Sequence, residues 1–319
     1  MTQLVLIGIG AGAATALLFA SVASGSLISV LLFYLAPLPI LIAALGWSHW
    51  AGLIAAVFAS AGLAVVFGSF MFLAFLLGIG LPAWWLGYLA LLGRPTGQPA
   101  PNDMEWYPAG SLVVWAAILG ALIVIAALIN FGAGEGDSRN AMRNAIERML
   151  RMQMRAPKGP PLDINRTVEI LMVVLPPAAA VVTTITNTLN LWLAGRIVSV
   201  SGRMKRPLPD LSAMRFPPYA PLLTGAALAA SFLPGMVGTA GLVLATAMLV
   251  AFAVLGLAVL HTVTRGVNAR MLLLGSVYAS VIVMLWPALF LILLGLADTA
   301  LDIRGRVAGR RGPPTAPST

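Results

Sequence analysis

The stretch that decides the fold is residues 167–218, which read TVEILMVVLPPAAAVVTTITNTLNLWLAGRIVSVSGRMKRPLPDLSAMRFPP. It begins as an apolar segment, is interrupted by Pro176 and Pro177, and turns polar over residues 183–190 before it enters a basic, proline-rich loop. A proline inside a helix removes a backbone hydrogen bond and favours a break or a kink. We therefore expect the chain to be organised around one interrupted membrane helix with a polar face.

The rest of the sequence carries very little charge. Of its 319 residues, 60% are hydrophobic and only 9% are charged, whereas the apolar share of soluble domains is about 45–50%. The composition therefore predicts an integral membrane protein. The net charge of +9 comes from loop residues. This indicates that the basic residues contact anionic lipid headgroups and act as topology signals. Nucleic acid is not an expected partner, because the aromatic and basic clusters that bind it are absent.

A helix needs about 20 apolar residues to cross the hydrocarbon core of a bilayer. Nine segments approach this length: 4–22, 27–45, 50–67, 70–92, 111–131, 168–193, 219–232, 236–261 and 271–296. The seventh is short, and the second contains Pro37 and Pro39, so eight crossings is the alternative. The predicted fold class is all-α, a polytopic membrane helix bundle of eight to nine spans. Residues 1–25 lack a positive n-region, so we expect a first span and not a cleaved signal peptide.

We divide the chain into four parts. These are an N-terminal membrane bundle over 1–133, a basic amphipathic helix with a proline-rich connector over 134–166, a C-terminal membrane bundle over 167–304, and a disordered tail over 305–319. With nine spans, the basic loops on either side of the sixth helix lie on opposite faces, and Lys and Arg divide almost evenly between the faces. A bent or re-entrant sixth helix would instead bring both loops to the cytoplasm.

Residues 138–155 have the pattern of an interfacial helix. Met142, Ile146 and Met149 recur at helical spacing on one face, which is typical of an amphipathic helix. The arginines that we expect to contact lipid headgroups are Arg139, Arg143, Arg148, Arg151 and Arg155. A basic amphipathic helix of this kind lies in the headgroup region of a membrane. The alternative is a solvated connector whose methionines pack on the protein.

The sequence offers few groups for catalysis. All ten acidic residues fall in loops or at span ends, so no carboxylate lies mid-membrane to couple protons or to hold a metal. The chain has no cysteine, which excludes thiolate sites. Neither His49 nor His261 is accompanied by a G-x-S-x-G elbow. We therefore predict a protein that is not an enzyme and has neither a metal nor a cofactor.

The polar part of the sixth helix is the strongest candidate for a binding site. Thr183, Asn187 and Asn190 are spaced i, i+4 and i+7, so they share one helix face. Such groups are costly against lipid, so the face must point into the bundle or into a wet cavity. We predict contact with a ligand, and hydrogen bonding between helices is the alternative.

Small residues recur every four positions in the first span, at Gly8, Gly12, Ala16 and Ala20. They form a flat seam on which another helix can approach closely. The seam serves either packing within the bundle or docking of a partner protein.

Two acidic residues, Asp298 and Asp302, lie one helical turn apart after the last span. Such a pair can bind a cation or receive an arginine from the loop that follows the sixth helix. We predict a structural ion pair between these aspartates and Arg196.

Several short motifs point to a family. They are Asn190, Arg196, Arg206-Pro207-Leu208-Pro209, Phe216-Pro217, the terminal set Gly295, Asp298, Asp302 and Arg304, and Leu38-Pro39-Ile40 with Gly46 and Gly52. Together they resemble the YybS-like predicted membrane proteins of bacteria. The resemblance implies a multi-pass protein of the bacterial cytoplasmic (inner) membrane.

The YybS-like family is distantly similar to the S components of energy-coupling-factor transporters. These small helical proteins bind a vitamin or a metal and dock on an ATPase-driven partner through small residues of the first helix. The run from Ala16 to Ala20 matches that A-x-x-x-A docking motif. The resemblance therefore implies an ATPase module or another membrane protein as a partner.

Two functions follow from the sequence. The first is transport-related binding of a small molecule at Thr183, Asn187 and Asn190, with energy supplied by a partner because the chain has no P-loop. The second is a non-catalytic membrane scaffold, similar in character to proteins of cell-envelope biogenesis. In that role the arginine-rich helix would bind anionic lipid or a cytoplasmic partner.

Overall fold

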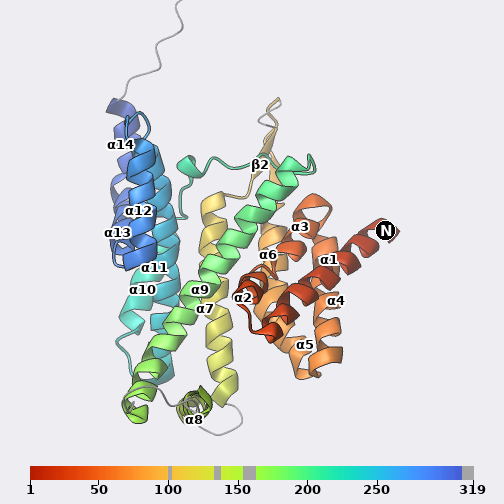
Figure 1. Cartoon of the computed structure of the whole chain (residues 1–319). Helices are drawn as coiled ribbons and strands as arrows, with labels where there is room; N and C mark the ends of the chain where they lie inside the picture. The colour runs from red at the N-terminus through yellow and green to blue at the C-terminus, as the bar shows by residue number, and fades with distance from the viewer. Residues whose placement is uncertain (100–102, 133–137, 154–162, 311–319) are drawn as a thin grey trace, which may run out of the picture.

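The chain folds into a bundle of membrane helices (Figure 1). The computed structural model describes residues 1–99, 103–132, 138–153 and 163–310. Within these residues, seven helical segments are long and apolar enough to cross a membrane. They are α1 (Thr2–Ala20) with η1 (Ser21–Ser24), α2 (Leu27–Tyr34) with α3 (Leu38–Gly46), α4 (His49–Phe67), α5 (Phe70–Phe75) with η2 (Leu76–Gly80) and α6 (Leu81–Ala90), α7 (Ala109–Gly132), α9 (Ile164–Val200) and α11 (Gly235–Val263). The predicted all-α, polytopic class is confirmed.

The predicted count of eight to nine full spans is not confirmed, because three further apolar helices are shorter than the other seven segments. The expected seventh span is the 12-residue helix α10 (Tyr219–Ala230), and the expected ninth is two helices, α12 (Arg270–Met284) and α13 (Ala288–Leu301). At about 1.5 Å per residue, none of the three covers a hydrocarbon core of about 30 Å. The ninth span breaks because Pro287 lacks an N–H and restricts the residue before it.

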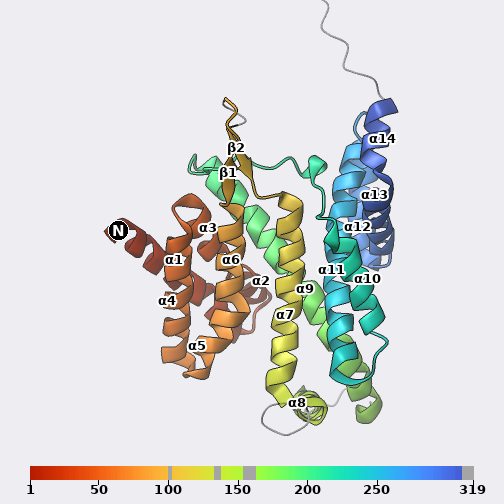
Figure 2. The ribbon, with the colours of Figure 1, turned by 180° about the vertical axis from the view of Figure 1, so that it is seen from behind.

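Helices α12 and α13 form a hairpin that runs along the C-terminal half of α11 and back (Figures 1 and 2). The backbones of α11 and α13 touch, since a Cβ atom at Gly256 would collide with Leu291 O and one at Gly295 with Phe252 O. Small residues permit such close approach in membranes. Leu285 in the turn is 74% exposed. We interpret the pair as a re-entrant hairpin that enters and leaves the membrane at one face.

The long helix α9 passes through Pro176 and Pro177 without a break. Its 37 residues correspond to a length of about 55 Å, and it runs obliquely across the bundle (Figure 1). Of the two alternatives for the sixth helix, the structure has one continuous helix long enough to span the membrane, and not a re-entrant segment. In hydrocarbon a freed backbone group finds no water, so the helix continues on both sides of the prolines.

The core is divided into clusters that meet at α7 and α9. Ala116 and Ala194 pack in a cluster with residues of α3, α4 and α6. Ala117 and Ala180, on the same two helices, pack in a second cluster with α10 and α11. Helices α7 and α9 therefore join the N-terminal helices to the C-terminal ones.

The connections lie at the two ends of the bundle. Strands β1 (Gly93–Pro95) and β2 (Met104–Trp106) pair antiparallel, an element that the sequence did not predict. They lie at the same end as the loop after α9, η3 (Leu211–Ala213) and α14 (Ile303–Arg310), whereas α8 (Ser138–Gln153) lies at the other end (Figures 1 and 2). The tail predicted to be disordered from residue 305 is helical through Arg310, and residues 311–319 lie outside the described part.

The hairpin fixes which basic segments share a face. The loop after α9, the α11–α12 turn and α14 lie together, and their basic residues outnumber those of α8. The positive-inside rule therefore favours a cytoplasmic location for this end.

Cysteine labelling tests this topology, because the chain has no cysteine of its own. We expect Lys205→Cys and Arg306→Cys to react with a membrane-impermeant maleimide from the cytoplasmic side, and Met149→Cys from the opposite side. Labelling of residues 149 and 306 from the same side would show that α12 and α13 together make a single crossing, and would contradict the hairpin.

Candidate functional site

A cavity of about 580 Å³ lies between α9 and α11, beneath the loop that follows α9. Its volume is within the range of about 300–1,000 Å³ that is usual for small-molecule sites. Most of its wall is apolar and includes Leu112, Val113, Leu189, Trp192, Val254 and Leu257. The site therefore has the general character of a pocket for a largely apolar molecule.

The loop over the cavity is anchored in the bundle. Met214 and Phe216 are buried, and the ring of Phe216 lies 5.2 Å from that of Phe252. Nearer α9, the guanidinium of Arg203 lies 4.6 Å from the centre of the Trp47 ring. These contacts hold the proline-rich segment between them across the top of the cavity.

Several polar side chains also line the cavity. His261 Nε2 and Tyr278 Oη lie 2.9 Å apart, and Arg270 Nη2 donates to His261 O at 3.3 Å. Arg265 Nη2 is 3.8 Å from Asp210 Oδ1. Arg206 completes the set, which contains three arginines and one aspartate among the lining residues.

Arg206 is the most buried charge in this set. It is 6% exposed, and its Nη1 donates to Ala90 O at 3.3 Å. Burial lowers the pKa of Arg206 from its ordinary value, because desolvation disfavours the charged form. The sequence placed this residue in a loop and gave no signal of its burial.

The predicted polar face of α9 does point into the bundle. Asn190 is 1% exposed, and its Nδ2 donates to Tyr34 O at 2.9 Å and to Thr186 O at 2.8 Å. Tyr34 ends α2, and the amide of Leu38 bonds to Leu35 O instead. Asn190 therefore satisfies a carbonyl that the break in the second span leaves free.

The other two residues of this face line a second, smaller cavity. Asn187 Nδ2 donates to Ala116 O at 3.5 Å, and Thr183 Oγ1 donates to Ala179 O of its own helix at 2.8 Å. Together with Thr186, both line a cavity of about 270 Å³ between α9 and α1, α2 and α5. Ligand contact at Thr183, Asn187 and Asn190 stays a prediction, and the bonds of Asn190 show a packing role.

The small-residue seam of α1 packs within the bundle and is not a docking surface. A Cβ atom at Gly8 would meet Ile54, and one at Gly12 would meet Ala55 O. Ala16 and Ala20 pack against the buried cluster around Phe75. Because α4 occupies the seam, the predicted partner site at these four residues is corrected to an internal helix contact.

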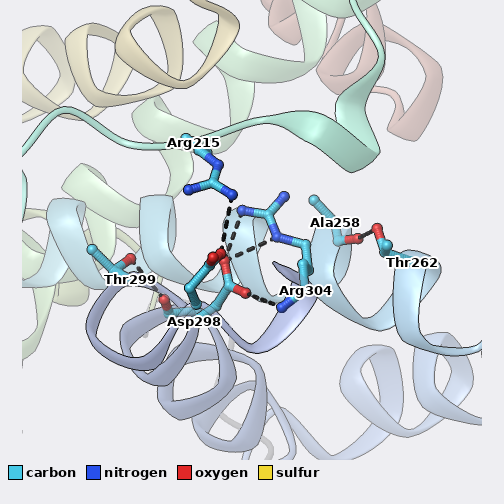
Figure 3. A network of polar contacts seen from close by, with 8 residues as sticks. Arg215, Ala258, Thr262, Asp298, Thr299 and Arg304 are labelled. Atoms are coloured by element: carbon cyan, nitrogen blue, oxygen red, sulfur yellow. Dashed lines mark hydrogen bonds and ion pairs between the residues drawn. The ribbon is translucent and has the colours of Figure 1, made fainter. Parts of the chain in front are cut away.

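The predicted ion pair of Arg196 with the acidic tail is also wrong. Asp298 accepts from Arg304 Nη2 at 2.7 Å, Nε at 2.9 Å and the backbone N at 3.0 Å. Asp302 accepts from Arg215 Nη2 at 3.0 Å. Figure 3 shows Arg304 turned back onto Asp298, with Arg215 approaching from the loop. Arg196 is exposed on α9, and the local turn after α13 brings Arg304 closer to Asp298.

The basic helix α8 lies where the sequence predicts a helix. Arg143 bonds to Glu147 and to Asn165 of α9, both at 3.2 Å, so it ties α8 to the bundle. Arg148 is exposed, and Arg151 lies 3.9 Å from Glu147. The side chain of Arg139 and all of Arg155 fall outside the described residues. Contact of these arginines with lipid headgroups stays a prediction.

Seven long apolar helices and a cavity within the bundle define a polytopic helical membrane protein. Over residues 13–299, the chain matches the family described as Predicted membrane protein (DUF2232), and it belongs to this family. No curated protein and no solved structure matches the chain. The resemblances to YybS-like proteins and to S components stay predictions.

The Asp298–Arg304 pair gives a stability prediction. Both side chains are at most 9% exposed, and removing one partner of a buried ion pair costs about 3–5 kcal/mol. We expect Asp298→Ala to lower the free energy of unfolding by this amount, measured in detergent by denaturant titration. The matched control is Glu105→Ala, which breaks an exposed pair with Arg94 and should cost less than about 1 kcal/mol. Equal losses in the two variants would contradict the structural role of Asp298.

Proposed function

We propose that the protein is a membrane-embedded binding protein for a small amphipathic molecule, with a transport-related role and energy supplied by a partner. The observation that carries the proposal is the cavity of about 580 Å³ between α9 and α11, with a mostly apolar wall and several charged side chains in its lining. The proposed setting is the cytoplasmic membrane of a bacterium, and the proposed role is not catalytic.

The shape of the site favours a ligand with two different ends. Burial of apolar surface contributes about 25 cal/mol per Å², and Leu189, Trp192 and Val254 offer such surface along the cavity wall. Among the polar lining residues, His261, Arg265 and Arg270 lie where α11 ends and α12 begins. A ligand would therefore lie with its chain among the helices and its head toward the membrane surface.

The proposal that a partner supplies the energy for transport rests on the small number of buried ionisable groups. Ion-coupled transport usually relies on ionisable groups within the membrane. Among the described residues, the only buried carboxylate is that of Asp298, and Arg304 already holds it. An ATPase module or another membrane protein is therefore the proposed energy source. Its docking surface would differ from the seam of α1, which α4 occupies.

Filling the cavity tests the proposal. Gly195 lines the cavity, and a Cβ atom there would have only Leu208 nearby, at 3.9 Å. We expect Gly195→Phe to abolish the thermal stabilisation that a single-chain amphiphile confers on the purified protein. Gly225→Phe is the control, because Gly225 on α10 faces open space. If no amphiphile stabilises the wild-type protein in a Gly195-dependent way, the proposed function fails.

A second candidate function is a scaffold that binds anionic lipid through α8. The exposed Arg148 and Arg151 at one end of the bundle favour it. We expect Arg148→Gln with Arg151→Gln to halve the amount of anionic phospholipid that copurifies, measured by lipid mass spectrometry. Each basic residue near an anionic surface contributes about 1 kcal/mol. Unchanged lipid content would count against this role, and Lys205→Gln at the other end serves as the control.

A further inference from the structure

We infer that the ligand of the α9–α11 cavity carries an oxyanionic head group of the alkyl phosphate class, and that Arg206 is its principal contact. This inference rests on the proposed function and specifies the class of ligand. It rests on the buried guanidinium group of Arg206, which has no carboxylate partner among the residues that the structure describes.

Arg206 is 6% exposed and lines the cavity. Its hydrogen bond goes to a neutral acceptor, Ala90 O. Among the residues that the structure describes, no carboxylate oxygen lies within 4.0 Å of its guanidinium. Buried charges in proteins are paired or bind a ligand, because an isolated one is costly. An anion in the cavity would supply the missing counter-charge.

A second arginine supports the same ligand. Arg270 lines the cavity, and its Nε atom is buried without a hydrogen-bond partner. Its Nη2 donates to His261 O, which is again a neutral acceptor. The cavity lining therefore contains an N–H donor without an acceptor. Its three arginines and one aspartate carry a net positive charge. Asp210, the acidic residue of the lining, already lies near Arg265.

Guanidinium groups suit this head group in particular. Their planar fork of N–H donors matches the geometry of phosphate and carboxylate oxygens, and Arg is preferred for phosphate recognition. The apolar wall below the arginines then suits a hydrocarbon chain. A cavity of about 580 Å³ is of the size that accommodates one small ligand. A single-chain alkyl phosphate combines both requirements.

Equilibrium binding of radiolabelled dodecyl phosphate to the purified full chain, in a non-ionic detergent, tests the inference. We expect saturable binding that Arg206→Gln weakens at least tenfold, because a charged hydrogen bond contributes about 1.5–3 kcal/mol. Arg206→Lys should retain part of the affinity. Arg196→Gln is the matched control, because this exposed arginine on α9 does not line the cavity, and it should bind like the wild type.

Competition experiments show whether the site recognises the whole alkyl phosphate, the phosphate group alone or the alkyl chain alone. Unlabelled dodecyl phosphate should displace the label, whereas dodecanol and inorganic phosphate should each compete at least tenfold more weakly. If inorganic phosphate competes equally, the amphiphilic ligand is refuted. If dodecanol competes equally, or Arg206→Gln binds normally, the anionic head group is refuted while a cavity function that depends on Gly195 stands.

A further variant covers the case in which Arg206→Gln does not fold. Arg270→Gln removes the second guanidinium and should weaken binding about three- to tenfold, less than Arg206→Gln, because Arg270 is less buried than Arg206. Wild-type affinity in this variant would overturn the role of Arg270 in binding the head group. If the wild-type protein binds neither dodecyl phosphate nor dodecanol, both the inference and the proposed function fail.

Discussion

A polar group buried in a membrane bundle must find its partner inside the protein, because hydrocarbon offers none. The structure depends on this constraint at several points. Asn190 of α9 donates to the carbonyl of Tyr34 that the break in the second span leaves free. Arg304 wraps back onto Asp298 and so fixes the turn after α13. Arg206 is the contrasting case, because its charge is buried beside a cavity and its partner is a neutral carbonyl.

Helix α9 connects these features. Its first turn bonds to α8 through Asn165, its middle carries the amide side chains, and its C-terminal part lines the cavity. The sequence predicted the position and the inward polar face of this helix from spacing alone, since i, i+4 and i+7 residues share a face. It did not predict that the helix continues through Pro176 and Pro177, because continuity depends on the surrounding low-polarity environment and not on the local sequence.

The other differences between the sequence predictions and the structure also arise from tertiary contacts. Apolar length located the seven long helices, but it treated 271–296 as one span although Pro287 divides it into a hairpin. The sequence left Gly8 and Gly12 as a seam for either internal packing or partner docking, and only the fold shows that α4 occupies it. The sequence placed Arg206 in a basic loop, and nothing in a run such as RPLP indicates that the loop folds down over a cavity. The candidate site was therefore largely beyond prediction, whereas most of the helices were not.

The most direct test of this account is an experimental structure of the full chain prepared with dodecyl phosphate. The account predicts density for a head group within hydrogen-bond distance of the Arg206 guanidinium, with the alkyl chain between α9 and α11. An empty cavity at saturating ligand would contradict it. So would density for the ligand at α8 alone.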